Sequence, residues 1–312
     1  MQLPVGPVAK LGSSSMRNII LVNPQAGRGA GPDLCRDLLR RQPQLTDSHI
    51  IDAPDALQAK RELIRALSPT TDTLVVIGGD GSLNLAVNAL LKCSLGKQVR
   101  LCPISAGTGS DFARALHPRL GIDIACRILA DSRSRPLDAL EVTWPDGSFR
   151  YGINTFSAGV AGLVSATMAS RATRGGAAYL RATLSAFFRY HACNCRVTVD
   201  GSDWYEGPLY LLAVTNGSHF GQGMQIAPKA QLDDGLAEVL AVTPMSRLLL
   251  LLRLVRLYLG NHLGAPYVRY CRGQTVTVIP AESVPAFDLD GETVPVGRVT
   301  IRLLPDAIRL AC

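Results

Sequence analysis

Three glycine-containing turns carry the side chains best suited to ligand binding. The turns are VNPQAGRGAG (22–31), GGDGS (78–82) and PISAGTGSDFARAL (103–116), and each follows an apolar, strand-like run. Glycine lets a backbone approach a phosphate closely, and a helix that begins after such a turn offers free N–H groups and the positive end of its dipole. Ligands collect at the carboxyl ends of parallel strands, so the three turns should line one crevice. This repetition indicates a polyphosphate such as ATP.

An acidic residue, Asp80, lies between glycines in the second turn. A carboxylate beside phosphates would repel them unless a cation lay between, and Mg²⁺ prefers one or two carboxylates with phosphate oxygens and water. The alternative is an Asp that turns the chain or caps the helix that follows, and it applies equally to Asp111 before FARAL. The common signatures G-x-x-x-x-G-K-[ST] and G-x-G-x-x-G are missing from the chain.

A second acidic group lies late in the chain, in FDLDGETV (287–294). Asp290 or Glu292 could face the crevice there and accept a proton from a hydroxyl. The alternative is a hairpin, because Asp-Gly between strand-like residues is a strong tight-turn signal. From this stretch alone the hairpin is the preferred interpretation.

Strand-like and helix-like segments alternate in the first part of the chain. Strands are predicted at 17–23, 48–53, 73–77 and 99–104, and helices at 32–41, 55–67, from 82 and from about 111. This alternation predicts a doubly wound parallel sheet covered on both faces. Short β segments dominate beyond about residue 138, with helical pieces at 175–190 and 245–260, which indicates an antiparallel sandwich or barrel. The predicted fold class is α/β plus β, with a domain boundary at about 140.

Net charge and composition restrict the kinds of molecule that the protein is expected to bind. The 312 residues carry a formal charge of +7, which favours anionic partners such as nucleotides or an acidic membrane surface. Aromatic residues make up only 5% and form no cluster with basic ones, which argues against nucleic-acid binding. The scattered cysteines indicate reduced thiols, and the N-terminus lacks an apolar core of signal-peptide length. We therefore expect a cytoplasmic protein.

A leucine-rich segment at 245–260 contains three arginines and is too short and too charged to span a bilayer. The preferred interpretation is a core helix whose arginines extend their charged ends to solvent. The alternative is a basic amphipathic helix that rests on an anionic membrane, at its inner face.

Four motifs occur in an order that resembles a known family. NPQAG (23–27), GGDGS (78–82), GTGSDFAR (107–114) and DGE (290–292) are similar to the diacylglycerol-kinase catalytic domain of bacterial lipid kinases. That family is related to sphingosine kinases and more distantly to NAD kinases. The segment 215–240 also resembles the family, so the match covers nearly all of the chain after Met16.

The resemblance implies ATP- and Mg²⁺-dependent phosphoryl transfer to a lipid hydroxyl. In the nucleotide site it implies a set of phosphate- and nucleotide-contacting residues: Asn23, Gly27, Gly78, Gly79, Asp80, Gly81, Ser82 and Thr108. Ser82 replaces the family's usual Thr, and Ser110 replaces an Asn. Asp138 would support the metal network around Asp80, and Glu292 would be the proton acceptor.

The resemblance further implies a second, structural Mg²⁺, held by the Asp234 carboxylate and by backbone carbonyls near Gln231 and Leu236. It implies a tail over 1–15, a nucleotide-binding domain over 16–140, a β-rich lipid domain over 141–296, and a segment 297–312 that returns to the first domain. A homodimer is expected only because dimers are common. The alternatives are an NAD kinase, or a nucleotide- or lipid-binding protein without catalysis. The sequence does not name the lipid.

Overall fold

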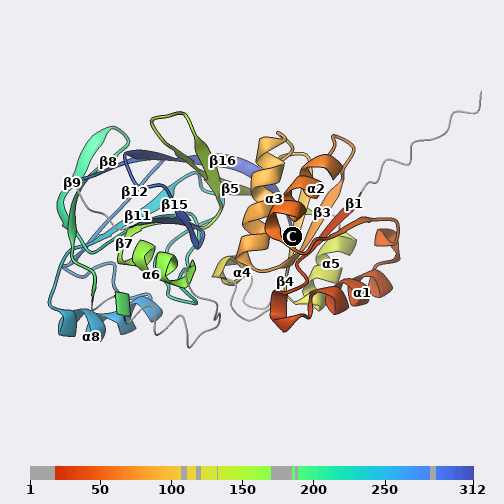
Figure 1. The fold of residues 1–312 in the computed structure, drawn as a ribbon, viewed down its shortest axis with the longest axis horizontal. Coiled ribbons are helices and arrows are strands. Elements are labelled where there is room, and N and C mark those ends of the chain that lie inside the picture. The colour runs from red at the N-terminus through yellow and green to blue at the C-terminus, as the bar shows by residue number, and fades with distance from the viewer. Residues whose placement is uncertain are drawn as a thin grey trace, which may run out of the picture.

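Two sheets form the framework of the protein (Figure 1). The computed structural model describes residues 18–106, 111–116, 121–131, 133–169, 185–186, 189–281 and 286–312. Thr108, Ser110 and most of the helix predicted at 175–190 lie outside the described residues. The larger sheet has ten strands and the smaller has six.

The first half of the chain supplies four parallel strands to the larger sheet. These are β1 (Asn18–Val22), β2 (His49–Asp52), β3 (Thr73–Gly78) and β4 (Arg100–Ser105), in the order β2-β1-β3-β4. All six residues of β3 are buried, as expected for a strand covered on both faces. The prediction of a parallel, doubly wound sheet is confirmed.

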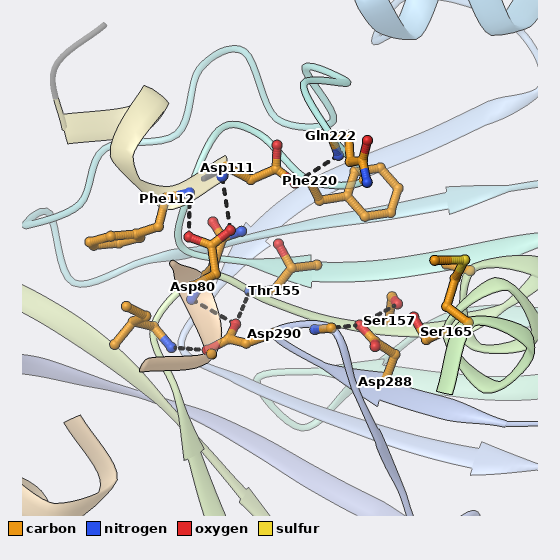
Figure 2. A pocket seen from close by; sticks show the side chains of 17 residues that line it. Asp80, Asp111, Phe112, Thr155, Ser157, Ser165, Phe220, Gln222, Asp288 and Asp290 are labelled. Atoms are coloured by element: carbon orange, nitrogen blue, oxygen red, sulfur yellow. Dashed lines mark hydrogen bonds between the residues drawn. The ribbon is translucent and has the colours of Figure 1, made fainter. Parts of the chain in front are cut away.

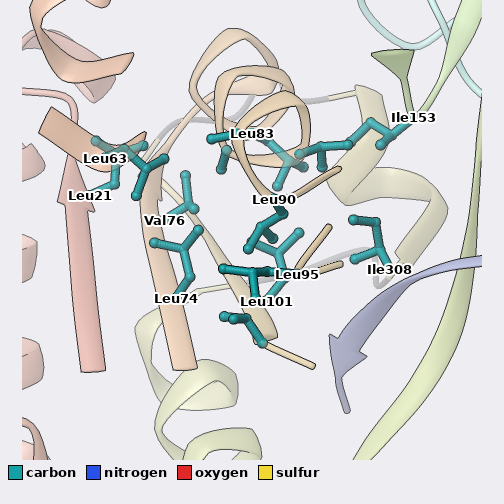
Figure 3. Close-up of a cluster of buried hydrophobic side chains, with 14 of the residues drawn as sticks. Leu21, Leu63, Leu74, Val76, Leu83, Leu90, Leu95, Leu101, Ile153 and Ile308 are labelled. Carbon is teal, nitrogen blue, oxygen red and sulfur yellow. The ribbon is translucent and has the colours of Figure 1, made fainter. Parts of the chain in front are cut away.

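Helices cover both faces of these strands. They are α1 (Gly31–Arg41), α2 (Ala56–Ala66), α3 (Asp80–Lys92), α4 (Asp111–Leu116) and α5 (Ile122–Asp131), with short 3-10 turns at Ala26–Arg28 and Pro43–Leu45. On one face, Leu63 of α2 and Leu83 and Leu90 of α3 belong to one buried cluster with Leu74 and Val76 of β3 (Figure 3).

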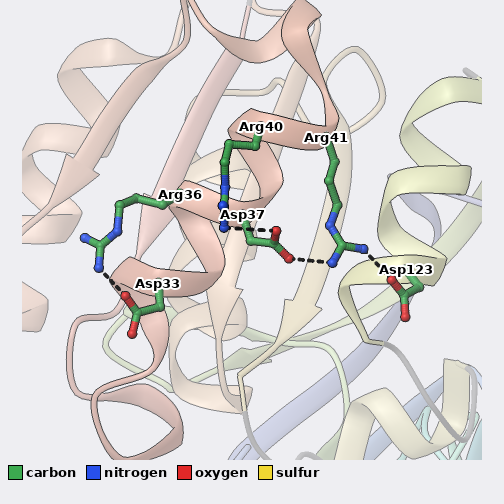
Figure 4. Close-up of polar contacts among 6 residues, drawn as sticks. All are labelled: Asp33, Arg36, Asp37, Arg40, Arg41 and Asp123. Carbon is green, nitrogen blue, oxygen red and sulfur yellow. Dashed lines mark hydrogen bonds and ion pairs between the residues drawn. The ribbon is translucent and has the colours of Figure 1, made fainter.

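The opposite face is covered by α1 and α5. Leu38 of α1 and Leu129 of α5 share a second buried cluster with Ile20 and Val75. Arg41 of α1 also pairs with Asp37, at 2.8 Å, and with Asp123 of α5, at 2.5 Å (Figure 4). These side chains remain partly or mostly exposed to solvent, where ion pairs contribute little, so the apolar contacts hold the two helices to the sheet.

Two long strands continue the larger sheet into the second half of the molecule. They are β5 (Ser134–Thr143) and β16 (Val299–Ala311). β16 pairs in parallel with β4 near its end and in antiparallel fashion with β5 along most of its length, with an irregularity between Leu304 and Ile308. The residues at which the sequence changes character, 136–142, therefore lie within β5 and not in a linker.

The second half is an antiparallel sandwich, as the sequence predicted. One layer consists of β6 (Phe149–Gly152), β8 (Cys193–Val199), β9 (Ser202–Leu209) and β13 (Thr275–Pro280) with parts of β5 and β16. The other is the six-stranded sheet: β7 (Thr155–Gly159), β10 (Leu211–Thr215), β11 (Ala237–Val242), β12 (Val268–Gly273), β14 (Phe287–Leu289) and β15 (Glu292–Val294). The rings of Phe156 and Phe287 meet edge to face between the layers, with their centroids 5.3 Å apart.

The outer face of the six-stranded sheet is covered by α6 (Val160–Ala169) and α8 (Arg247–Tyr258). Val164 of α6 and Leu257 near the end of α8 pack in one cluster with Ala213 and Leu240 of the sheet. Among the helices in the described part of the chain, none has both the length and the apolar composition needed to cross a bilayer.

Candidate active site

A cavity of about 520 Å³ lies between the two halves of the molecule (Figure 2). Its wall contains polar residues from both halves and apolar residues between them. The lining residues include Asp80, Gly81, Asp111, Phe112, Ile153, Asn154, Thr155, Ser157, Ala161, Ser165, Met168, Phe220, Gln222, Asp288, Asp290 and Gly291. A concave space with a few convergent polar groups is the usual form of a small-molecule site.

Asp80 is the first residue of α3, but its carboxylate points toward α4. Oδ2 accepts a hydrogen bond from the backbone N–H of Asp111 at 2.9 Å, and Oδ1 accepts one from Phe112 at 3.4 Å. Asp80 therefore does cap a helix, as the alternative predicted, but the helix is α4, which begins 31 residues further on, and not the one that follows directly. The same contact places a carboxylate in the cavity wall.

Asp111 brings a second carboxylate to the same place. Its Oδ2 accepts the N–H of Gln222 at 2.8 Å, whereas its Oδ1 is buried and has no hydrogen-bond partner within the described residues. Burial raises the pKa of Asp111 to about 6, and the nearby charge of Asp80 raises it as well, against the hydrogen bond from Gln222. Two adjacent carboxylates with an unpartnered oxygen are a donor set that fits Mg²⁺.

The predicted glycines have different structural reasons. At Gly27, where φ is +61°, a Cβ would come 1.8 Å from the carbonyl oxygen of Ala106, and at Gly78 it would come 2.4 Å from the Ser82 hydroxyl. The protein's own packing therefore requires these two. At Gly79 and Gly81 a Cβ would meet nothing within 4 Å in the described part of the chain. Those two leave the start of α3 open to a ligand.

The first and second turns touch each other, as their position at one sheet edge predicted. The Asn23 side chain donates a hydrogen bond to the Ser82 hydroxyl at 3.2 Å, and its Oδ1 accepts the N–H of Gln25 at 3.0 Å. The third turn begins beside them, because the N–H of Ala106 donates to the Gly78 carbonyl at 3.1 Å. Thr108 and its neighbours in that turn are not among the described residues.

Asp290 is held by hydrogen bonds on both carboxylate oxygens. Oδ2 accepts from the side chain of Asn84 on α3 and from the N–H of Ile153, both at 2.8 Å. Oδ1 accepts from the N–H groups of Asn154 and Thr155, at 3.0 and 2.8 Å. Burial raises the pKa of Asp290 and the four donors oppose that rise. All its lone pairs are used, and its main effect is to join α3 to the 153–155 segment.

Glu292 lies at the start of β15 and is exposed. It is absent from the described cavity wall, although Gly291, the residue before it, belongs to that wall. The prediction of a hairpin in FDLDGETV is correct, because β14 and β15 pair in antiparallel fashion with Leu289 opposite Glu292. Asp290 thus belongs to the cavity wall, whereas Glu292 is exposed next to it; which of them accepts a proton stays a prediction.

Asp288 is a cavity residue that the sequence did not single out. It is only 6% exposed and lies beside Ser157 of β7 and Ser165 of α6 (Figure 2). Burial raises the pKa of Asp288 to about 7, with the charge of Asp290 acting in the same direction and the two serine hydroxyls opposing. Side chains alternate between the two faces of the sheet along β14, so Asp288 lies on the face opposite to Phe287 and Leu289. The sequence does not reveal that α6 covers that face.

The residues predicted to hold a structural Mg²⁺ lie outside the cavity wall, and the one carboxylate among them is paired with an arginine. The Arg272 guanidinium forms an ion pair with Oδ2 of Asp234, and Oδ1 accepts the N–H of Leu236 at 3.1 Å. Arg272 also pairs with Glu238, between Nε and Oε1 at 3.1 Å. Asp234 therefore already has a cationic partner, and its role in holding a metal stays a prediction.

Asp138 is fully buried next to this group and is not among the residues that line the cavity with Asp80. Its carboxylate accepts the N–H groups of Gly235 and Asp306, both at 2.8 Å, and its own N–H donates to the Leu232 carbonyl. These bonds tie β5 to the 232–235 turn and to the irregular part of β16. The role in the metal network that the resemblance implied for Asp138 therefore gains no support from its position.

Comparison with known proteins gives two family matches. Residues 17–142 match the model of the diacylglycerol kinase catalytic domain, and residues 154–312 match that of the YegS C-terminal NAD kinase beta sandwich-like domain. A probable lipid kinase YegS-like of Pseudomonas aeruginosa is 32% identical over 258 residues, covering 81% of this chain and 80% of that protein. A diacylglycerol kinase of Mycobacterium tuberculosis is 28% identical over 265 residues, covering 83% of each.

Solved structures share the fold. A diacylglycerol kinase from Bacillus anthracis str. Sterne has a TM-score of 0.71 at 17% identity, over 95% of this chain and 96% of that one. An NAD kinase from Archaeoglobus fulgidus in complex with ATP has a TM-score of 0.53 at 12% identity, over 95% and 93%. At these identities the similarity concerns the fold alone.

Proposed function

Since this chain belongs to the lipid kinase family that joins a diacylglycerol kinase catalytic domain to a YegS C-terminal domain, and is a kinase, we propose that it transfers the γ-phosphate of ATP to a lipid hydroxyl with Mg²⁺. The observation that carries the proposal is the cavity between the halves. Carboxylates from the parallel-sheet half and apolar and hydroxyl groups from the sandwich half line one space.

The nucleotide phosphates are assigned to the start of α3. Gly79 and Gly81 are open there, and the free N–H groups and the dipole of a 13-residue helix favour an anion. Asn23, Gly27, Gly78, Ser82 and Thr108 complete this site in the proposal. Asp80 and Asp111 would hold Mg²⁺, which, when bound, supplies positive charge to the phosphate oxygens in a loose transition state.

The acceptor lipid is assigned to the opposite side of the cavity. Ala161 and Met168 of α6, with Phe220, give that side apolar surface for an acyl chain. Glu292 is the proposed proton acceptor, because Asp290 has no lone pair left for the hydroxyl proton and Glu292 lies one residue beyond the cavity wall.

The test is an assay with labelled ATP and Mg²⁺ against diacylglycerol, monoacylglycerol, phosphatidylglycerol, a sphingoid base, ceramide and NAD. We expect a phosphorylated lipid and no phosphorylated NAD, with products identified by mass spectrometry. Phosphorylation of NAD alone would identify an NAD kinase. Tight ATP binding without turnover on any acceptor would identify a binding protein. The expected homodimer is checked separately by sedimentation.

Contact with an anionic membrane at the inner face completes the proposal. Leu252 and Val255 of α8 and its C-cap residue Leu259 are spaced three and four residues apart and are 65%, 59% and 65% exposed. A stripe of exposed apolar side chains beside arginines, on a chain of charge +7 with a lipid substrate, suits a lipid surface. The core-helix interpretation describes only the other side of this helix, where Leu257 packs against the sandwich.

Replacing Leu252 and Leu259 together by Gln is expected to weaken binding to phosphatidylglycerol-containing vesicles by about tenfold or more, because two side chains no longer enter the apolar layer. Thermal stability and turnover of a short-chain soluble lipid should stay near wild type. The matched control replaces Leu57 and Ile64, exposed on α2, by Gln. Equal vesicle binding by the two double variants, measured by co-sedimentation at low and high salt, would rule out α8 as the contact.

A further inference from the structure

Asp288 is a buried carboxylate with an unused oxygen in the wall of the cavity. Its neighbours on β14, Phe287 and Leu289, belong to the core between the sandwich layers. Asp288 therefore projects to the opposite face, in the layer between the six-stranded sheet and α6, where Val160 and Val164 are buried. A carboxylate in such an apolar layer reduces stability unless it is well bonded.

The bonds of Asp288 are few and long. Oδ1 accepts from the Ser157 hydroxyl at 3.4 Å and from the N–H of Gly291 at 3.3 Å. Oδ2 is buried and has no hydrogen-bond partner within the described residues. Asp290, two residues further on, accepts four bonds of 2.8 to 3.0 Å in the same wall. The contrast separates a carboxylate that holds the chain together from one that keeps unused acceptor capacity.

Two hydroxyls accompany the free oxygen. Ser157 lies opposite Asp288 in the register of β7 and β14, and Ser165 reaches the same point from α6. A carboxylate flanked by hydroxyls is suited to accept hydrogen bonds from a donor group that enters the cavity. The Asp80 and Asp111 carboxylates line the same cavity, so one headgroup can present one polar group to each side.

We infer that Asp288, with Ser157 and Ser165, binds a second hydrogen-bond donor of the lipid headgroup, so that the favoured acceptors carry a hydroxyl or ammonium group beside the hydroxyl that is phosphorylated. This inference rests on the proposed lipid kinase function. It separates acceptors with at least two donors, such as a monoacylglycerol or a sphingoid base, from diacylglycerol, whose free hydroxyl is its only donor.

The test compares kcat/KM for three lipids of equal chain length: a monoacylglycerol, a sphingoid base and a diacylglycerol. The wild-type protein should favour the first two over diacylglycerol by about tenfold or more, the effect of one charge-assisted hydrogen bond. Asp288→Asn should lose about that factor through KM for the two-donor lipids and change diacylglycerol turnover little. A larger loss for the sphingoid base than for the monoacylglycerol would identify ammonium as the preferred donor.

Two further variants make the readout specific. Ser165→Ala should reduce the same preference by a smaller factor, because it removes a neighbouring hydroxyl and not the acceptor. Asp146→Asn, in an exposed turn, is the control for loss of a carboxylate. Equal preference in the wild type and Asp288→Asn, or a wild type that prefers diacylglycerol, would overturn the inference.

A failure of the proposed kinase function can be distinguished from a failure of the Asp288 site. If no lipid is phosphorylated, the proposed kinase reaction fails, and thermal stabilisation by the monoacylglycerol without ATP then tests the binding site alone. Stabilisation of the wild type but not of Asp288→Asn would support the inference, and equal shifts would reject it. Asp288→Asn should itself melt at or above the wild-type temperature, because an unpartnered charge is removed. A clearly lower melting temperature would make Asp288 structural and reject the site.

Discussion

Glu292→Gln is expected to lower kcat by about 10²- to 10⁴-fold, the usual effect of removing a positioned general base. The change keeps the shape of the side chain and its place on the exposed start of β15. Because the group acts on the acceptor hydroxyl, the affinity for ATP should change little. Single-turnover rates with saturating lipid, together with ATP binding measured by calorimetry, provide the check.

Asp290→Asn is the matched variant and should behave differently. The single oxygen of the Asn amide can accept from at most two of the four donors. Its NH₂ group would then face the remaining N–H groups, so the link between α3 and the 153–155 segment weakens. We expect a lower melting temperature as well as lower activity. If Glu292→Gln keeps most of its kcat while Asp290→Asn remains stable and inactive, Asp290 is the base.

Asp80→Asn is expected to lower turnover by more than about 100-fold at millimolar Mg²⁺, because a lost metal ligand costs at least as much as a lost partner of that ligand. The apparent requirement for Mg²⁺ should rise, since Asp111 alone would remain of the proposed carboxylate pair. An Asn oxygen can still accept one of the two N–H bonds at the start of α4, so the fold should persist. Turnover against Mg²⁺ concentration and thermal unfolding are the measurements.

The control for Asp80 is a capping carboxylate away from the cavity. Asp55 accepts the N–H of Gln58 at 2.9 Å at the start of α2, and Asp55→Asn should leave activity unchanged. A similar loss of stability in the two variants, with turnover of Asp80→Asn near wild type, would leave Asp80 with a capping role only.

The fold was predictable where the pattern was local. The buried run of β3 and its alternation with helices gave the parallel sheet, and the short β segments of the second half gave the sandwich. The places that sequence reasoning missed depend on distant partners. Asp80 reaches a helix 31 residues away, and Arg272 reaches Asp234 across 38 residues. The periodic pattern of apolar residues within one segment does not predict contacts between residues so far apart in the chain.

The candidate site was predictable in part for the same reason. Motifs located Asp80 and the Asp-Gly-Glu hairpin, and the hairpin's own turn decides that Asp290, with φ of +52°, faces inward. Asp288 was missed because strand alternation gives its face but not the helix laid over that face. Only the packing of α6 turns an apparently solvent-facing acid into a buried one.

The position of β16 has a consequence for how the chain is made. β16 lies between β4 and β13 in the larger sheet, yet it follows both in the chain. During synthesis the parallel strands therefore emerge with β4 as an uncovered edge, a site prone to pairing with other chains, and the strand that covers it leaves the ribosome some 200 residues after β4, or about 10 to 40 s at ordinary rates of translation. The larger sheet therefore reaches its final strand order only after β16 has been made, when translation has passed Ala311.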